Sequence, residues 1–321
     1  MLQPVRIWYV AGQRLCNLDC TYCVSVGTWA KSNRYDWADP GDRTTYQRVV
    51  EWIGSRPFPV KVRLGSLGEP FASPFFLDKA AWLTRQPGVE HVELLSNAIL
   101  LPRRLPKMET AANLGRLSLW LTWHDGQVEL ERFIAAASFA QETYGCFVVV
   151  NALLFQDNAD AVARARDAAV QAGLRFNVDL GYDPAATGEA GAEMGDASAA
   201  VPALRAPDAL ATLAQCGGNR ALAETALRGL SSCQGTLCRA GHDSVFIDIH
   251  GQVFRCSNYS SQSLAPLGSV LAPDFELPLR TERWAPCGAA GGCGNKEDFL
   301  NLQIAGALRP TEVPSLGWPD A

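Results

Sequence analysis

The sequence lacks the features that mark membrane, exported and nucleic-acid-binding proteins. No apolar run in its 321 residues approaches the ~20 residues that a membrane-spanning helix needs. The opening segment, MLQPVRIWYV, has no basic region followed by a long apolar core and a small-residue cleavage site, so we expect no export signal and a cytoplasmic location. Basic residues are scattered singly or in pairs and the net charge is -5, which argues against binding to a nucleic-acid backbone. With 48% hydrophobic and 19% charged residues, the chain is expected to be soluble and globular.

Cysteine, by contrast, is plentiful, with ten residues in the chain. In a reducing compartment these are expected to be metal ligands rather than disulfides. Three of them, Cys16, Cys20 and Cys23, fall on one short stretch just after the apolar run Val5–Val10. Thiolates suit iron–sulfur clusters and zinc, and three ligands without a fourth nearby leave one metal position open for a small molecule. The other interpretation is a partial zinc site or a set of reduced, buried thiols.

Short β-rich runs alternate with longer amphipathic stretches in the first part of the chain. The expected strands are Val5–Val10, Val60–Leu64, Val92–Leu95, Leu117–Trp123, Phe147–Leu154 and Arg175–Leu180. The expected helices are Thr44–Ser55, Pro74–Arg85, Arg104–Leu114, Glu129–Tyr144 and Asn158–Ala172, the last one capped by Asn158 and ended by Gly173. This alternation predicts βαβ units and an α/β fold with a parallel sheet, whose six strands are fewer than the eight of a closed barrel.

The spacing Cys-x-x-x-Cys-x-x-Cys, with the aromatic Tyr22 before the last cysteine, resembles the signature of the radical S-adenosylmethionine (SAM) superfamily. The core of that superfamily is a partial, six-stranded (β/α)6 TIM-like barrel, which agrees with the expected strands. The resemblance implies that Cys16, Cys20 and Cys23 hold three irons of a 4Fe-4S cluster, whose fourth iron binds SAM. Reductive cleavage of SAM would then yield a 5′-deoxyadenosyl radical that removes hydrogen from a carbon atom.

Two further segments of the resemblance follow the second and third expected strands. Gly68-Glu69-Pro70 matches part of a Gly-Gly-Glu-Pro-like segment that holds the amino group of the SAM methionine, although Leu67 replaces the first glycine. Ser96 and Asn97 stand where relatives often have a Thr-Asn-Gly-like segment near the SAM carboxylate and ribose. The alternative for Ser96 and Asn97 is that they simply cap a turn.

Two later strands add candidates at the same rim. Asn151, on the fifth strand, stands at a position comparable to polar residues that contact SAM in relatives; a satisfied buried asparagine is the other interpretation. His124, at the end of the fourth strand, is a candidate proton acceptor, or a histidine that only hydrogen-bonds.

The composition changes twice along the chain, which predicts three parts. Residues 1–182 would form the radical SAM partial barrel. Residues 183–232 would form a flexible connection rich in alanine and glycine, followed by a linker helix over 209–230 that is broken around Gly217 and Gly218. Residues 233–321, rich in cysteine and glycine, would form a small C-terminal α+β domain.

Four cysteines of this last part can close a metal site. Cys238 and Cys256 flank two alternating runs about a turn at Gly251, a predicted β-hairpin that would bring them together. Cys287 and Cys293 stand in a glycine-rich loop. The pattern of cysteine, glycine and cysteine resembles the opening of the SPASM and Twitch extensions of radical SAM enzymes, and four cysteines imply a Twitch-like domain with one auxiliary 4Fe-4S cluster. Zinc bound by four cysteines is the alternative.

Cys233 lies five residues before Cys238. It could replace Cys238 as a ligand, or it could act catalytically by donating a hydrogen atom to a substrate radical. We expect Cys146, at a strand start, to be an ordinary small buried residue.

The resemblance implies an enzyme of the dehydrogenase or epimerase type with two 4Fe-4S clusters, SAM and an external electron donor such as flavodoxin or ferredoxin. We expect its substrate to be a polar small molecule, of the sugar, aminoglycoside or aminocyclitol, or nucleoside type, in natural-product biosynthesis. The reason is that a first strand at Val5 leaves no room for the N-terminal peptide-binding domain of many peptide-modifying relatives. Modification of a ribosomally made peptide is the alternative enzyme function, and a non-catalytic iron–sulfur or zinc-binding protein is the alternative of another class.

Overall fold

Six parallel strands in sequence order form the centre of the molecule. The computed structural model describes residues 3–23, 36–37, 40–181, 208–218, 233–290, 293 and 296–303. The central strands are β1 (Val5–Ala11), β2 (Val60–Ser66), β3 (Val89–Ser96), β4 (Leu117–Trp123), β5 (Phe147–Leu154) and β6 (Arg175–Leu180). Each strand pairs in parallel with the next. The predicted parallel α/β sheet is therefore confirmed.

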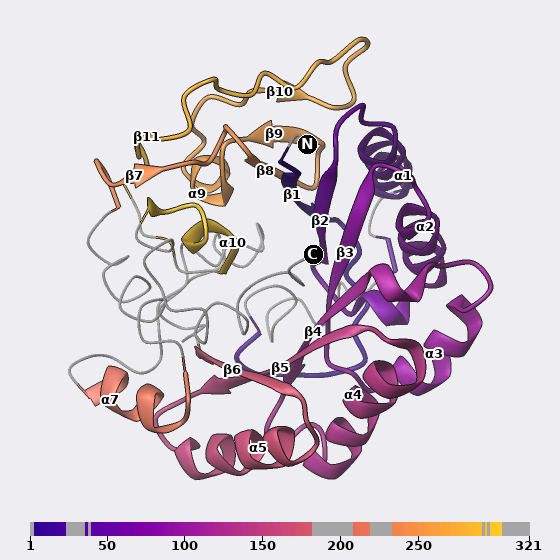
Figure 1. The fold of residues 1–321 in the computed structure, drawn as a ribbon, viewed down its shortest axis with the longest axis vertical. Coiled ribbons are helices and arrows are strands. Elements are labelled where there is room, and N and C mark those ends of the chain that lie inside the picture. Colours follow the sequence, from indigo (N-terminus) through magenta and orange to yellow (C-terminus); the bar gives the residue numbers. More distant parts are fainter. Residues whose placement is uncertain are drawn as a thin grey trace.

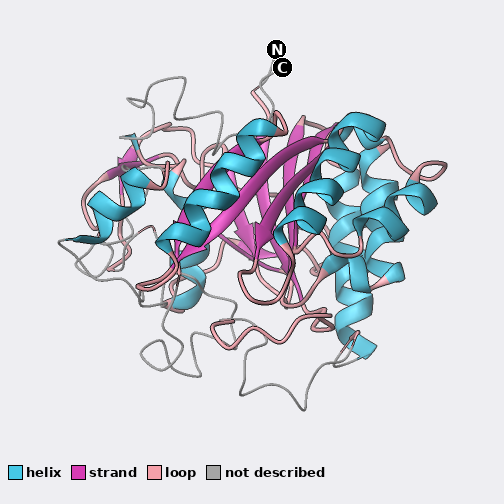
Figure 2. Ribbon diagram, turned by 90° about the horizontal axis from the view of Figure 1, so that it is seen from below, coloured by secondary structure: helices cyan, strands magenta, loops and turns pink. Residues whose placement is uncertain are grey.

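A helix follows each of the first five strands and lies on the outer side of the curved sheet (Figure 1). These helices are α1 (Pro40–Gly54), α2 (Pro74–Thr84), α3 (Leu101–Met108), α4 (Leu130–Tyr144) and α5 (Ala159–Gln171). Two short 3-10 helices, η2 (Pro70–Ala72) and η3 (Leu114–Arg116), precede α2 and β4. Figure 2 shows the helices gathered around the strands, which cross the middle of the molecule.

Three details of the expected helices are wrong. α1 begins at Pro40 rather than at Thr44, because proline is well suited to the first position of a helix. α3 begins and ends earlier than the predicted range 104–114, because Leu101-Pro102 already supplies a helix start. Asn158 does not cap α5 with its side chain; its Oδ1 atom instead accepts a hydrogen bond from the backbone of Phe155. Gly173 does follow the end of α5, with a φ of 67°, which favours glycine.

Side chains of the central strands alternate between two environments. Val178 and Leu180 of β6 pack into the core under the helices, so Asn177 and Asp179 point to the opposite face, because neighbouring side chains of a strand alternate. On β4 the same alternation places Trp120 away from the helix-covered core. We call the face that carries Trp120, Asn177 and Asp179 the inner face of the sheet.

The predicted C-terminal hairpin is present but does not stand apart from the sheet. Its strands β8 (Ser244–Ile247) and β9 (Gln252–Phe254) are antiparallel, and β8 pairs in parallel with β1. With β10 (Gly268–Ser269), the nine strands run in the order β10-β9-β8-β1-β2-β3-β4-β5-β6, with the hairpin beside β1 in Figure 1. β10 and β6 form the two edges, so the described strands do not close a barrel.

Smaller elements complete the C-terminal part. They are β7 (Leu237–Cys238), which pairs with β11 (Ala285–Pro286), and the short helices α9 (Ser257–Ser261) and α10 (Lys296–Phe299). The predicted connection falls mostly outside the described residues, although α7 (Asp208–Gln215) occupies the start of the expected linker helix. None of the helices that the structure describes has the length and apolar character to cross a bilayer.

Candidate functional site

The cysteine loop, residues 12–23, leaves β1 at the carboxyl ends of the central strands. The backbone N–H of Cys23 donates to the carbonyl of Cys20 at 3.2 Å, and the N–H of Leu18 lies 3.5 Å from the Cys16 sulfur. Cys20 is buried, Cys16 and Cys23 are half-buried, and none of the three forms a disulfide. The three predicted ligands are thus reduced thiols on one short loop.

The segment after β2 is hydrogen-bonded along the start of this cysteine loop. The N–H of Gly68 donates to the carbonyl of Gln13 at 2.9 Å, and the N–H of Glu69 donates to that of Leu15 at 2.8 Å. A Cβ atom on Gly68 would overlap the carbonyl oxygen of Leu15 and would lie 2.7 Å from that of Arg14. Glycine is therefore required here for close approach of the two backbones, and the first two predicted motifs are in direct contact.

The carboxylate of Glu69 joins the ends of β2 and β3. One oxygen accepts from the N–H of Phe71 at 3.0 Å and from the Ser96 hydroxyl at 2.8 Å, and the other accepts from the N–H of Asn97 at 2.8 Å. Burial raises the pKa of Glu69 from 4.5 to about 7, against the lowering effect of these hydrogen bonds. Pro70 follows as the first residue of η2, which Glu69 caps.

Ser96, the last residue of β3, and Asn97 begin the turn that follows this strand. The Ser96 hydroxyl accepts from the N–H of Ala98, whose φ is 65°, and Asn97 Oδ1 accepts from the N–H of Ile99. The amide of Asn97 also donates to Asn17 Oδ1 at 3.0 Å, which ties the cysteine loop to β3. Turn capping, one of the two interpretations from the sequence, is observed; contact with SAM remains a prediction.

Tyr22 and His124 connect the cysteine loop to the end of β4. The Tyr22 hydroxyl lies 3.1 Å from His124 Nδ1, and the two rings are stacked with centroids 5.9 Å apart. The ring of Phe155 also packs on that of Tyr22, with centroids 4.7 Å apart. Burial lowers the pKa of His124 to about 4, so its imidazole is neutral at neutral pH and Nδ1 can accept from Tyr22. The observed role of His124 is to position Tyr22, and its role as a proton acceptor stays a prediction.

Asn151 belongs to a row of polar side chains on the inner face. Its amide group lies 3.4 Å from the Thr122 hydroxyl, and its Oδ1 accepts from Asn177 at 2.8 Å. Asn177 also donates to Asp179 Oδ1 at 3.0 Å. Asn151 is thus a buried, hydrogen-bonded asparagine, and its contact with SAM remains a prediction.

The C-terminal cysteines gather in one buried group that we call the cysteine cluster, namely Cys233, Cys238, Cys256, Cys287 and Cys293. The pairing of β7 with β11 places Cys238 opposite Ala285, and the backbone N–H of Cys287 donates to Thr236. The group packs against Trp120 and Val149 on the inner face of β4 and β5. The structure therefore brings together the four predicted ligands and adds Cys233 to them.

The thiols of the cysteine cluster lie in an electrostatically uneven environment. A hydrogen bond between Cys233 and Cys293 lowers the pKa of the Cys233 thiol to about 6 and raises that of Cys293. Burial raises the pKa of Cys238 to about 11. Burial raises the pKa of Cys256, and the carboxylate of Asp298 on α10 raises it further. This carboxylate accepts hydrogen bonds from the backbone and the hydroxyl of Ser257. Asp298 was not predicted, since a single acidic residue after a glycine-rich loop carries no sequence signal.

The donor atoms of both groups fit thiolate-ligated clusters. All are reduced cysteines, three in the cysteine loop and five in the cysteine cluster. In the part of the chain that the structure describes, no three His, Cys, Asp or Glu side chains are arranged to hold a metal ion as they stand. The thiols would therefore have to move toward one another to hold a bound group.

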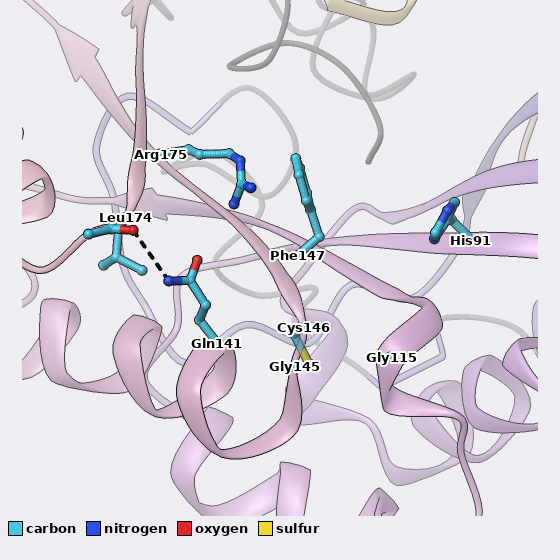
Figure 3. A pocket seen from close by; sticks show the side chains of 9 residues that line it. His91, Gly115, Gln141, Gly145, Cys146, Phe147, Leu174 and Arg175 are labelled. Atoms are coloured by element: carbon cyan, nitrogen blue, oxygen red, sulfur yellow. Dashed lines mark hydrogen bonds between the residues drawn. The ribbon is translucent and has the colours of Figure 1, made fainter. Parts of the chain in front are cut away.

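A cavity of about 540 Å³ lies at the opposite, N-terminal ends of β3, β5 and β6 (Figure 3). Its lining includes His91, Gln141 and Arg175, whose guanidinium stacks on Phe147 at 4.1 Å. Cys146 also lines it, and burial raises the pKa of this thiol to about 12, as expected for an unreactive core cysteine. None of the site residues predicted from the sequence lies among the residues that line this cavity.

Comparison with known proteins places the fold. No protein-family model matches the chain, and no curated protein does. The structure of polyhistidine-tagged anSMEcpe with bound AdoMet matches 84% of this chain and 75% of that one, at 14% identity and a TM-score of 0.51. Native anSMEcpe with bound AdoMet matches 84% of this chain and 79% of that one, at 16% identity and a TM-score of 0.49. BtrN in complex with AdoMet and 2-DOIA matches 84% of this chain and 80% of that one, at 13% identity and a TM-score of 0.43. These findings define the fold class: the chain has an α/β fold similar to that of anSMEcpe.

Proposed function

We propose that the chain is a radical SAM enzyme in which Cys16, Cys20 and Cys23 ligate a 4Fe-4S cluster. The observation that carries this proposal is the assembly of three separate motif segments around one loop. Gly68 and Glu69 lie along the start of the cysteine loop, and Asn97 holds its middle through Asn17. A non-catalytic iron–sulfur protein has no need of this arrangement.

SAM would occupy the rim beside these segments. Glu69 and the backbone after β2 would hold its amino group, with Tyr22, Ser96, Asn97 and Asn151 as the other predicted contacts. When bound, the cluster and SAM supply a 5′-deoxyadenosyl radical that removes hydrogen from a substrate carbon. The chain itself orients the loop and keeps Tyr22 in place through His124.

The cysteine cluster would hold an auxiliary 4Fe-4S cluster as in a Twitch-like extension. Cys238, Cys256, Cys287 and Cys293 are the proposed ligands. These cysteines pack against Trp120, which supports a position for the auxiliary cluster on the inner face of the sheet. The cysteine loop follows β1 of the same sheet. Cys233 remains a candidate ligand or hydrogen donor, because its thiol contacts that of Cys293.

The substrate would be a polar small molecule of the sugar, aminocyclitol or nucleoside type, and the reaction an oxidation or an epimerisation. Polar side chains on the inner face, among them Thr122, Asn151 and Asn177, support a polar rather than an apolar substrate. A fully cysteine-ligated auxiliary cluster favours oxidation, since it offers electron transfer rather than a free iron. Hydrogen donation by Cys233 would favour epimerisation instead.

Anaerobic reconstitution tests the proposal. We expect about eight irons per chain and reductive cleavage of SAM to 5′-deoxyadenosine with an external donor such as flavodoxin or ferredoxin. Cys20→Ala should abolish cleavage and remove about four irons, whereas Cys256→Ala should also lose about four irons yet retain some cleavage. Cys146→Ala, at a buried thiol outside both groups, is the matched control and should keep both clusters.

Full SAM cleavage by Cys20→Ala would contradict the assignment of the cysteine loop. About four irons together with zinc in the wild-type protein would make the cysteine cluster a structural zinc site. Stimulation of 5′-deoxyadenosine formation by a precursor peptide, with no response to sugars or aminocyclitols, would change the substrate class to a ribosomal peptide.

A further inference from the structure

The side chain of Asn177 on β6 has an acceptor atom that the protein does not use. Asn177 is 1% exposed. Its amide nitrogen donates to both Asn151 Oδ1 and Asp179 Oδ1. Its own Oδ1 atom is buried and has no hydrogen-bond partner among the described residues. Because the two N–H groups are already directed at carbonyl or carboxylate oxygens, the orientation of this amide is fixed and the unused atom is the oxygen.

Buried acceptors without a partner are uncommon in folded proteins and call for an explanation. An unsatisfied amide oxygen costs free energy in the absence of a donor. A ligand that presents an O–H or N–H group to this atom would remove that cost. Asn177 Oδ1 is therefore a fixed hydrogen-bond acceptor that is available to a ligand.

Asn177 belongs to a row of polar side chains on the inner face of the sheet. In the sheet, Thr122, Asn151 and Asn177 are direct neighbours on β4, β5 and β6. Along the chain, Thr122 stands between Trp120 of β4, which packs on the cysteine cluster, and His124 just after β4, which contacts Tyr22 of the cysteine loop. The row thus starts at Thr122, between these two contacts, and runs across the inner face to Asn177 on β6.

We propose that Asn177 Oδ1 is a substrate-recognition acceptor that takes a hydrogen bond from a hydroxyl or ammonium group. This inference rests on the proposed function and narrows it to substrates rich in hydrogen-bond donors. The half-buried carboxylate of Asp179, 3.0 Å from the same amide, adds negative charge and favours an ammonium group. Such an acceptor discriminates strongly against substrates that lack the hydroxyl or ammonium group, because they would leave the buried oxygen of Asn177 unpaired.

Binding of two probes to the anaerobically reconstituted, SAM-loaded protein tests this site. The probes are 2-deoxystreptamine, which carries amines and hydroxyls, and myo-inositol, which carries hydroxyls only; affinity is measured by calorimetry. Asn177→Leu, close in size, should weaken binding of the probe by about tenfold. Ser118→Ala is the matched control, because the Ser118 hydroxyl is also buried on the inner face without a partner but lies further from the rim. Binding of SAM by Asn177→Leu, measured in the same way, shows that the variant is folded.

Asp179→Asn identifies the group that is bound. Weaker binding of 2-deoxystreptamine with unchanged binding of myo-inositol would establish an ammonium group, and equal binding of both a hydroxyl. The proposal is overturned if the wild-type protein binds SAM but neither probe, or if Asn177→Leu binds the probes as the wild type does. It is also overturned if Asn177→Leu weakens SAM as much as the probe, since the residue would then belong to the SAM site. Failure of the wild-type protein to bind SAM would instead overturn the proposed function.

Discussion

Gly68 fixes the distance between the segment after β2 and the start of the cysteine loop. Its N–H bonds to Gln13, and the space for a side chain is filled by the carbonyl groups of Arg14 and Leu15. Any Cβ atom would push the chain that leads directly into Cys16. This one position therefore couples a backbone requirement to the geometry of a proposed cluster ligand.

We predict that Gly68→Ala lowers the free energy of unfolding by about 1–3 kcal/mol and reduces iron incorporation at the cysteine loop, because the strain falls on backbone atoms that cannot rotate away. Iron content and urea unfolding of the variant measure the two effects. Gly65→Ala is the matched control, since a Cβ atom there would meet its nearest neighbour at an ordinary 3.5 Å. Equal iron content and stability of the two variants would contradict the prediction.

Glu69 gives the stability of the chain a specific pH dependence. Its pKa is raised by burial from 4.5 to about 7, so between these pH values the folded protein holds a proton that the unfolded chain has released. The protonated carboxyl of Glu69 therefore contributes to the free energy of unfolding below pH 4.5, and this contribution is lost as the pH rises toward 7. The loss amounts to about 3 kcal/mol for a shift of this size.

We predict that Glu69→Gln removes this dependence, because an amide does not titrate. In urea unfolding from pH 4.5 to pH 7 without SAM, the stability of the wild type relative to Glu69→Gln should fall by about 3 kcal/mol. A constant offset from the changed hydrogen bonds does not affect this slope. Parallel stability curves for the two proteins would show that the carboxyl of Glu69 titrates normally.

Between elements, a buried ionic group joins α10 to the central sheet. Arg63 of β2 lies 3.1 Å from Glu93 of β3 and 3.3 Å from Glu297 of α10, and all three side chains are buried. Arg6 of β1 hydrogen-bonds to Asn301 just beyond the same helix. These contacts hold the segment that carries Asp298 against the strands.

We predict that Arg63→Met destabilises the protein by about 3–5 kcal/mol, because two buried carboxylates lose their shared cation. The surface pair of Lys79 and Glu51, 3.2 Å apart, is the matched comparison, and Lys79→Met should cost about 0–1 kcal/mol. Urea unfolding of both variants at pH 7 measures the difference. Similar losses from the two substitutions would mean that the buried group contributes no more than a surface ion pair.

The sequence was most informative where a structure depends on local pattern. Strands β4, β5 and β6 match their predicted ranges. β6 alternates polar and apolar residues, whereas β4 and β5 are short runs rich in apolar and β-branched residues, and both patterns are typical of strands. The helix starts were less predictable. Asparagine is a common N-cap residue, yet the Asn158 side chain accepts a hydrogen bond from the backbone of Phe155 in the preceding turn instead of capping α5.

At the scale of the whole molecule, some residues of the candidate site could be predicted from local sequence pattern and others could not. The cysteine spacing and Gly68-Glu69 could be recognised from sequence, since each is a contiguous motif. Asn17 and Asn177 could not, because their roles depend on partners that lie on other strands. Asn177 does alternate with the apolar residues of β6, and this period-2 pattern of a polar residue within a buried strand was the one signal available.

The pairing of β8 with β1 was likewise invisible in the sequence and makes the fold depend on the C-terminal part. β8 covers the edge of β1, and Phe246 packs edge-on against Trp8 with ring centroids 4.9 Å apart. We predict that a chain of residues 1–218, which lacks β8, associates through the open edge of β1. Light scattering after size exclusion measures the association, and a chain of residues 1–303, which keeps every described strand, is the matched control. A monomeric 1–218 chain with the melting temperature of the control would contradict the prediction, because the six parallel strands would then fold without the hairpin.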